Sequence, residues 1–255
     1  MSTELSLFNS GCACFAGLQV LTICDMQSTS IQTLLSVPVG QRGDAWESDF
    51  LRELPKASVR IVNDTAVAGP DGWPYLLLAT DLAPGADAPV DADRIDSFVN
   101  VAQWIATRGL GLVLNPEKAM PDFVMTYGMV WNFRERGEFL TLPEKSAGEK
   151  SAGGPIEIRD GQQLHAGAPS LAYLPQDVRS VLREFLKRQR VFEPRVLMIS
   201  TDNQITWDLA FSLESLGSPP ASEHAGIAEA ISWFLPAHYS VALINESSVP
   251  GFSAL

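Results

Sequence analysis

The most reactive side chains in this chain belong to three cysteines near its N-terminus, Cys12, Cys14 and Cys24. An odd number of cysteines at one end is not the pattern of a disulfide framework. Cys-x-Cys with a third cysteine ten residues later also lacks the paired spacing of a zinc site, and no histidine lies nearby in the sequence. We interpret the three as reduced, partly buried thiols. The alternative is a thiol nucleophile or a metal site.

The three histidines, His165, His224 and His238, lie far apart in the sequence. None is spaced from another histidine or from a cysteine as a metal-ligand pair or as a nucleophile and its base. The sequence therefore gives little support for a mechanism in which a histidine transfers protons. We expect the three side chains at the surface.

A run of aspartates could suggest a site for a hard cation. Its members are Asp81, Asp87, Asp91, Asp93 and Asp96. Their spacing is not that of an EF-hand loop, and aspartates at the start of a helix complement the helix dipole. We therefore predict a helix start and no metal site.

No standard catalytic signature occurs in the sequence. The Gly-x-Ser-x-Gly elbow, the P-loop, the dinucleotide-binding Gly-x-Gly-x-x-Gly and the His-Glu-x-x-His zinc motif are all absent. The sequence therefore assigns no catalytic residue and predicts no cofactor. It favours a protein without enzymatic activity.

Six tryptophans invite a binding interpretation. Trp104, Trp207 and Trp233 fall on apolar faces of predicted elements, so we expect them in the core. Trp73 begins a predicted strand beside a turn, and Trp131 lies on a helix rich in large apolar residues. We predict Trp73 and Trp131 as binding residues that are partly exposed or packed between two halves of the chain. The alternative for both is a place in the core.

The elements that would position these side chains follow one order twice. Each half is predicted to run helix, strand, strand, helix, strand. The starts are Asp44, Ser58, Trp73, Asp93 and Leu110 in the first half, and Pro175, Arg195, Gln204, Ser222 and Ser240 in the second. Equivalent starts lie about 130 residues apart, and the helices that carry Trp104 and Trp233 match. This pattern favours an internal duplication.

Several boundaries follow from local signals. Asp91 or Asp93 is predicted to open a helix whose apolar residues are spaced three and four apart up to Ile105. Pro121 is predicted to open a helix over residues 122–136 that ends at Gly137. Residues 205–213 alternate apolar with smaller or polar residues, which is typical of a half-buried antiparallel strand.

A Glu-Lys-Ser-Ala-Gly unit occurs twice between residues 144 and 153, and it has no apolar period. This composition predicts a flexible linker. We therefore expect an N-terminal α+β domain over residues 1–142, a linker over 143–170 and a C-terminal α+β domain over 171–255. Residues 1–40 carry no legible pattern.

A hairpin followed by a crossover helix in each half predicts the fold class. We expect an α+β fold of two similar halves, each a mixed sheet with helices on one face.

The charge of the chain limits its partners. With 30 acidic and 18 basic residues the net charge is −12, which repels phosphate backbones and anionic membrane surfaces. We expect neither nucleic acid nor membrane as a partner. The first residues, Met1 to Glu4, lack the basic region of a signal peptide. We therefore expect a cytoplasmic protein.

Two stretches of sequence resemble a known family. Tyr173-Leu-Pro-Gln-Asp-Val-Arg-Ser-Val-Leu-Arg-Glu-Phe-Leu186, followed by Val196-Leu-Met-Ile199, resembles the C-terminal domain of SseB-type proteins, the enhanced serine sensitivity family. Leu112-Val-Leu-Asn-Pro116 resembles the strand with Asn-Pro of that family's N-terminal domain. The first 40 residues and the long linker depart from the family. The resemblance implies a two-domain bacterial cytoplasmic protein, and it carries no catalytic residue across.

These observations lead to two functional hypotheses. The first is a non-enzymatic protein-binding or regulatory protein, an adaptor or a neutralising partner, whose acidic surface suits a basic protein. The second is an enzyme with a site between the two halves that uses Cys12 or Cys14 as its nucleophile.

Overall fold

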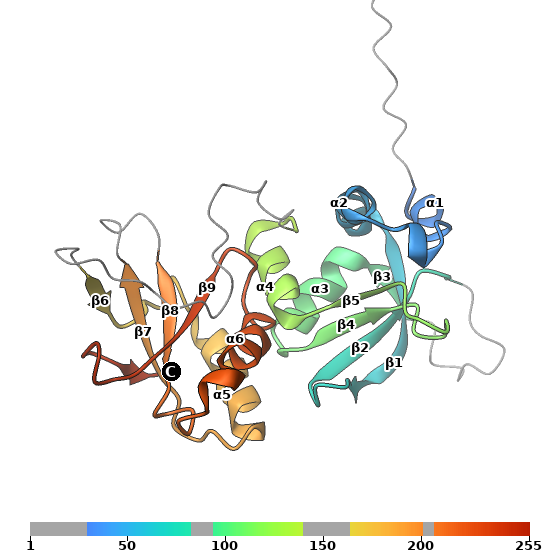
Figure 1. Ribbon diagram of the computed structural model, residues 1–255. Helices are drawn as coiled ribbons and strands as arrows, with labels where there is room; N and C mark the ends of the chain where they lie inside the picture. The colour runs from blue at the N-terminus through green and yellow to red at the C-terminus, as the bar shows by residue number, and fades with distance from the viewer. Residues whose placement is uncertain (1–29, 83–93, 140–163, 201–206) are drawn as a thin grey trace, which may run out of the picture.

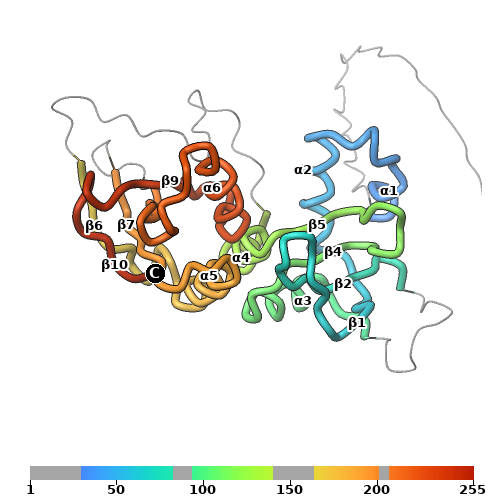
Figure 2. Tube along the Cα trace, turned by 60° about the horizontal axis from the view of Figure 1, so that its bottom comes forward, coloured from blue at the N-terminus to red at the C-terminus, as the bar shows by residue number. Residues whose placement is uncertain are grey.

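The computed structural model of the chain describes residues 30–82, 94–139, 164–200 and 207–255. They form two five-stranded sheets, and most of the helices lie between the sheets, whereas the first two helices lie at the end of the first half that is farther from the second sheet (Figures 1 and 2).

The first sheet has the strand order β3-β1-β2-β4-β5. The strands are β1 (Ser58–Ala68), β2 (Pro74–Ala79), β3 (Ile95–Ser97), β4 (Gly111–Leu114) and β5 (Phe123–Met125). Neighbouring strands are antiparallel except for β2 and β4, which are parallel. The helix that crosses from β2 to β4 makes this parallel pairing possible, because parallel strands need a long connection.

Helices cover one face of this sheet. They are α1 (Ile31–Leu35), α2 (Asp44–Glu53), α3 (Phe98–Ala106) and α4 (Tyr127–Arg136), with the 3-10 turns η1 (Val39–Gln41) and η2 (Leu54–Lys56). Their apolar side chains pack with Val59, Ile61, Leu76 and Leu78 in one core cluster. Thr126 caps α4 by accepting a hydrogen bond from the N–H of Met129, and Gly137 ends the helix in the left-handed conformation, as expected.

The second sheet has the same arrangement of its central strands. It comprises β6 (His165–Gly167), β7 (Arg195–Ser200), β8 (Asp208–Ser212), β9 (Ser240–Ile244) and β10 (Ser253–Ala254). β7 and β8 are antiparallel, β8 and β9 are parallel, and β6 and β10 both pair antiparallel with β7. Helices α5 (Gln176–Arg188) and α6 (His224–Ser232) precede β7 and β9, and η3 (Ala221–Glu223) leads into α6.

The predicted fold class is confirmed. Each half contains an antiparallel hairpin followed by a parallel crossover through a helix. The second half follows the predicted order of helix, strand, strand, helix, strand, and the first half adds β3 before its crossover helix. The origin of this likeness in a duplication stays a prediction.

Two predicted helices start later than expected. Residues 95–97 form β3 along the edge of β1, and α3 begins at Phe98, where Ser97 accepts a hydrogen bond from the N–H of Asn100. Residues 123–125 form β5 along the edge of β4, so the helix expected from residue 122 begins at Tyr127. In both places, the residues before the helix pair with a neighbouring strand, and a Ser or Thr side chain then caps the helix at its later start.

The strand expected to be half-buried is buried on both faces. All five residues of β8 are buried. Leu209 and Phe211 face α5 and α6, whereas Ala210 packs with Val249 and Phe252 of the C-terminal segment. The alternation in the sequence therefore reflects larger side chains on one face of β8 and smaller ones on the other. It does not reflect exposure, because the C-terminal segment covers the second face.

Part of the predicted linker belongs to the second sheet, because His165–Gly167 pairs with Met198–Ser200. Residues 140–163 lie outside the described residues. Among the helices of the described ranges, none is long and apolar enough to cross a membrane.

Candidate functional site

The aromatic joint between the halves contains both predicted binding residues. We define it as Trp73, Tyr127 and Trp131 from the first half, with Phe185, Phe234 and Tyr239 from the second. Trp73 and Trp131 have exposed fractions of 4% and 3%, and both belong to the core cluster of α5 and α6. The sequence left three alternatives for Trp73 and Trp131: partial exposure, packing between the halves, or a place in the core of one half. The structure shows that both pack between the halves.

A tight turn orients Trp73. The N–H of Gly69 donates to the carbonyl of Trp73 at 2.8 Å, and the carboxylate of Asp71 accepts the N–H of Trp73 at 3.0 Å. The same carboxylate accepts the hydroxyl of Tyr75 at 2.8 Å. Burial and this hydrogen bond raise the pKa of Tyr75, so its hydroxyl remains a donor.

The indole of Trp73 is held on several sides. Its N–H donates to the carbonyl of Gly109 at 2.8 Å. Its ring meets Phe234 edge-on with 4.9 Å between centroids, and Phe185 with 6.2 Å. The guanidinium of Arg188 lies 5.0 Å from the ring centroid and donates to the carbonyl of Gly72 at 2.8 Å. Tertiary packing therefore satisfies both the polar and the apolar parts of this side chain.

Helix α4 is the second contact between the halves. Trp131 meets Tyr239 edge-on with 5.5 Å between centroids, and the N–H of Gly128 donates to the carbonyl of Trp233 at 3.0 Å. A Cβ at Gly128 would lie 2.2 Å from the carbonyl oxygen of Leu235. This contact requires glycine, because no real side chain tolerates such a distance.

Charged groups border the joint. Arg134 donates to Asp177 at 2.6 Å across the two halves. Burial lowers the pKa of Arg134, but the hydrogen bonds to Asp177 and Glu135 outweigh it and raise the pKa overall. Arg136 lies 3.1 Å from the Nε2 of His238, whose pKa is lowered by burial and by that guanidinium. This side of the joint is thus held by an ion pair.

Three buried polar atoms on α4 have no hydrogen-bond partner within the described part of the chain: Tyr127 Oη, Trp131 Nε1 and Asn132 Oδ1. Burial and the charge of Asp177 raise the pKa of Tyr127, and burial raises that of Tyr239 to about 12. Both phenols are therefore protonated at neutral pH, so neither serves as a general base.

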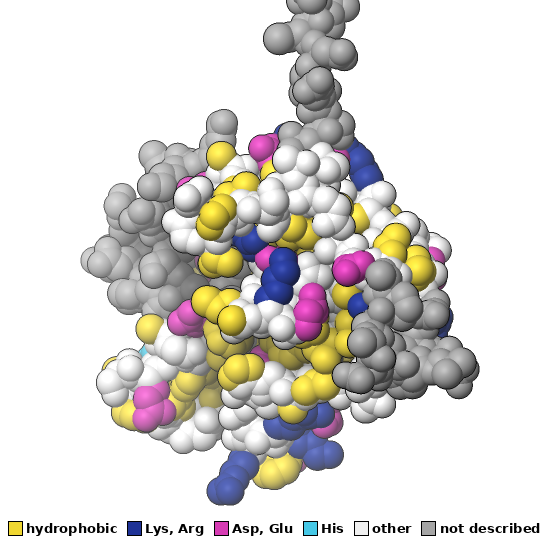
Figure 3. Space-filling view, turned by 90° about the vertical axis from the view of Figure 1, so that its right-hand side faces the viewer, with side chains coloured by type: hydrophobic (Ala, Val, Ile, Leu, Met, Phe, Trp, Pro, Cys, Tyr) yellow, Lys and Arg dark blue, Asp and Glu magenta, His cyan; other side chains and the backbone are white. Residues whose placement is uncertain are grey.

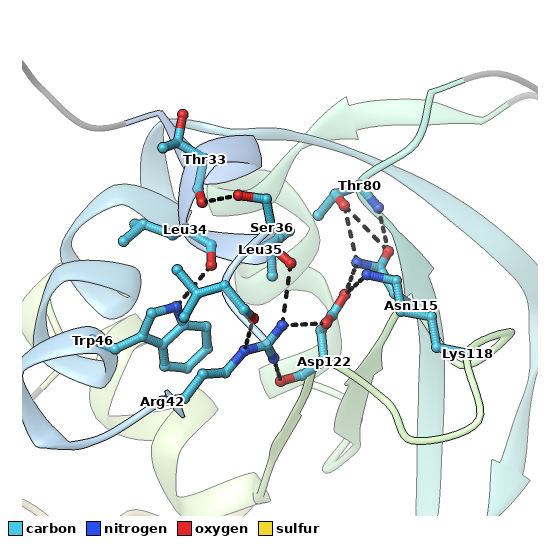
Figure 4. Close-up of polar contacts among 11 residues, drawn as sticks. Thr33, Leu34, Leu35, Ser36, Arg42, Trp46, Thr80, Asn115, Lys118 and Asp122 are labelled. Carbon is cyan, nitrogen blue, oxygen red and sulfur yellow. Dashed lines mark hydrogen bonds and ion pairs between the residues drawn. The ribbon is translucent and has the colours of Figure 1, made fainter. Parts of the chain in front are cut away.

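A polar network ties the first helices to the first sheet (Figure 4). Arg42 donates to the carboxylate of Asp122 at 2.8 Å and to its carbonyl at 3.0 Å, and to the carbonyls of Leu35 and Val37. The guanidinium of Arg42 lies 4.5 Å from the ring centroid of Trp46. Side chains 80 residues apart are thus joined at the end of β4.

Asn115 completes this network. Its backbone is left-handed with φ 53°, a conformation that asparagine tolerates better than most residues. Its side-chain carbonyl accepts the N–H of Thr80 at 2.8 Å, and its amide donates to Asp122 at 2.6 Å. Asn115 therefore links the ends of β2 and β4 to the loop before β5.

The Asp122 carboxylate is buried, with a side-chain exposed fraction of 1%. Burial by itself raises the pKa of this carboxyl, but hydrogen bonds from Lys118, Asn115 and Arg42 outweigh it and hold the pKa below its usual value. A carboxylate with three donors is stabilised in its charged form and is a poor proton acceptor. The network is therefore best explained as a structural link.

None of the three tryptophans expected in the core is fully buried. Trp233 is 41% exposed, because it follows the last turn of α6 and its backbone carbonyl, not its ring, contacts α4. Trp104 is half-buried and lies 4.1 Å from the guanidinium of Arg108. Trp207, which directly precedes β8, is also half-buried. The prediction was wrong for Trp233, because helical spacing alone does not show where the partner element ends, whereas Trp104 packs against the first core cluster at its edge.

The other sequence candidates are dispersed. Cys12, Cys14 and Cys24, and the aspartates at 87, 91 and 93, lie outside the described residues. Within the described ranges, no group of three or more His, Cys, Asp or Glu side chains could hold a metal ion. His165 lies on β6, His224 begins α6, and His238 lies beside Arg136.

Sequence reasoning missed Arg42 and Asp122. The one local signal was Asn115-Pro116, which formed part of the family resemblance. An arginine in a loop gives no sign of a partner 80 residues away.

Comparison with protein-family models, curated proteins and solved structures finds no match for this chain.

Proposed function

We propose that this chain is a non-enzymatic protein-binding or regulatory protein of the bacterial cytoplasm, an SseB-like adaptor or neutralising partner. The observation that supports it most is an open apolar sheet surface. Ile95 and Val124 lie on the first sheet and have exposed fractions of 46% and 48%. They lie on the two edge strands, and Leu77 and Val113 between them are partly exposed. Exposed apolar surface on a folded protein can mark an interaction site.

The charge of the chain favours a basic partner. A net charge of −12 attracts positively charged proteins and speeds their encounter. The joint supports the same role, because its packed aromatic rings and the Arg134–Asp177 ion pair hold the two halves together as one scaffold.

Affinity purification tests this function. The tagged full-length chain is used to capture proteins from an extract of the source cells, and the captured proteins are assayed for reversible binding to the purified chain. We expect a basic protein whose affinity falls as salt is added. Recovery of no binding protein, together with turnover of a metabolite by the purified chain, would contradict the proposal.

A further inference from the structure

The outer face of the first sheet follows from the strand register. Leu76 and Leu78 pack against the helices, so Leu77 points to the opposite side of β2. Leu77 pairs with Val113, and Val113 pairs with Val124, and cross-strand partners share a face. By the same register this outer face comprises Arg60, Tyr75, Leu77, Ala79, Ile95, Val113 and Val124.

This outer face is mainly apolar, and it is open at Ile95 and Val124. Arg60, Tyr75 and Ala79 are buried, and Val113 packs in part against the cluster of α5 and α6, to which Tyr75 belongs. Ile95 and Val124 are exposed, while Leu77 and Val113 between them are partly exposed. Figure 3 views the first half from the side away from the second half, and it shows hydrophobic side chains gathered among charged ones. The charged side chain of the outer face, Arg60, is buried and donates to the carbonyl of Asp81.

The second half covers the equivalent face of its own sheet. The C-terminal segment, residues 245–255, runs across the side of β7, β8 and β9 that points away from the helices (Figure 1). Val249 and Phe252 are buried there, with exposed fractions of 4% and 8%, against Leu197, Ala210 and Ala242. Two apolar side chains on a short segment of turns and irregular backbone thus help to close such a face, together with Leu164 and Ile244.

Polar contacts at both ends hold the C-terminal segment. Ser253 and Ala254 pair with β7 as β10, and Arg195 donates to the carbonyl of Phe252 at 3.0 Å. Arg195 also forms an ion pair with Glu246, whose carboxylate accepts the hydroxyl of Ser212 at 2.7 Å. The segment therefore combines apolar anchors with backbone pairing and one charged contact.

In the first half, the chain that follows β4 takes a different course from the chain that follows β9, the equivalent strand of the second half. Following β4, the chain forms β5 and then α4, which packs on the inner face with the other helices. No equivalent of Val249 and Phe252 covers Ile95 and Val124 within the described ranges, since both remain about half exposed.

We propose that the outer face of the first sheet docks a short irregular segment of a basic partner protein, which inserts apolar side chains as the C-terminal segment does on the second sheet. This inference rests on the proposed protein-binding function and specifies its surface. The segment carries two apolar residues spaced like Val249 and Phe252, with Lys or Arg beside them. The net charge of −12 favours this occupant over a second copy, which has the same charge.

Selection from a library of random short peptides, displayed on phage, tests the inference with the purified full-length chain. We expect enriched peptides with two apolar residues separated by two others and with basic flanks. Synthesised peptides should bind Val124→Asp at least about tenfold more weakly than the wild type, because a charge replaces an apolar contact. Val124→Ser should show a smaller loss in the same direction if the fold is intact by circular dichroism.

Phe192→Asp is the matched control, because Phe192 is 72% exposed and lies between α5 and β7, away from the outer face. Its affinity for the peptides should equal that of the wild type. Equal binding by Val124→Asp, failure to enrich any peptide, or self-association that Val124→Asp abolishes would overturn the inference. If a protein from the extract still bound Val124→Asp, the inference would fail and the protein-binding function would stand.

Discussion

Trp73 of the first half meets Phe234 of the second edge-on, with ring centroids 4.9 Å apart and an interplanar angle of 89°. This contact places a residue from the start of β2 in the core cluster of α5 and α6. The two halves therefore share one apolar core at the joint. We expect them to unfold together, because separating them would expose both tryptophans to water.

Replacing Trp73 with alanine should strongly destabilise the protein. The change removes the contacts with Phe185 and Phe234 and leaves the carbonyl of Gly109 without its donor. We expect a loss of about 3–5 kcal/mol in the free energy of unfolding, measured by chemical denaturation. Trp104→Ala is the control, and its smaller loss follows from its partial exposure. Equal losses for the two variants would contradict a shared core at Trp73.

Gly128→Ala should disrupt the contact between α4 and the end of α6. The new methyl group would lie 2.2 Å from the carbonyl oxygen of Leu235, so the backbones must separate. Gly226→Ala is a matched control inside α6, where nothing lies within 4 Å of the added methyl group. That variant should gain roughly 0.5–1 kcal/mol from helix propensity. A melting temperature unchanged in Gly128→Ala would show that the halves do not pack this closely.

The order of helices and strands could be predicted from the sequence more completely than the contacts between distant parts of the chain. Hydrophobic periodicity and turn residues located β1, β7, α5 and the helix-strand-strand-helix-strand order, because these signals are local. β3 and β5 were missed because three residues beside a capped helix carry no strand pattern of their own. Their pairing depends on the free edges of β1 and β4, which only the assembled sheet provides.

The same reasoning explains what was found of the site. Trp73 was singled out because it begins a predicted strand beside a turn, and Trp131 because its predicted helix is rich in large apolar residues. Their burial between the halves depends on α5 and α6, which lie on the far side of the predicted linker. The partnership of Arg42 with Asp122 has no local signature at all, since 80 residues separate them.

Asp122→Asn should destabilise the protein in a pH-dependent way. The folded-state pKa of Asp122 is lowered, so its stabilisation is complete above the unfolded value of about 3.9 and is lost as pH falls through the folded pKa. At pH 7 the variant should lose about 3 kcal/mol, because Arg42 stays buried without a counter-charge. This difference from the wild type should shrink as the pH falls below about 4.

Asp49→Asn is the control for the Asp122 measurement. Asp49 pairs with Arg52, but both side chains are about half exposed. Exposed pairs contribute little, so we expect a change within roughly 0.5 kcal/mol at all pH values. An Asp122→Asn variant with the same small, pH-independent effect would refute the structural role of the network.

Tyr127→Phe should leave the stability unchanged or raise it. The hydroxyl of Tyr127 is buried without a hydrogen-bond partner in the described part of the chain, so its removal sacrifices no such contact there. Tyr239→Phe is the contrasting variant, because the hydroxyl of Tyr239 donates to the carbonyl of Tyr173. That variant should lose about 1 kcal/mol. Thermal unfolding of both distinguishes these outcomes, and a larger loss for Tyr127→Phe would reveal an unseen partner at the joint.

Amide hydrogen exchange of the full-length chain, with and without the protein captured from the extract, tests the central claim most directly. The claim is that a basic partner binds the outer face of the first sheet. We predict slower exchange in β2, β4 and β5 around Leu77, Val113 and Val124, and unchanged exchange in β7 and β8, whose equivalent face the C-terminal segment already covers. Protection confined to the second sheet or to α5 would contradict it.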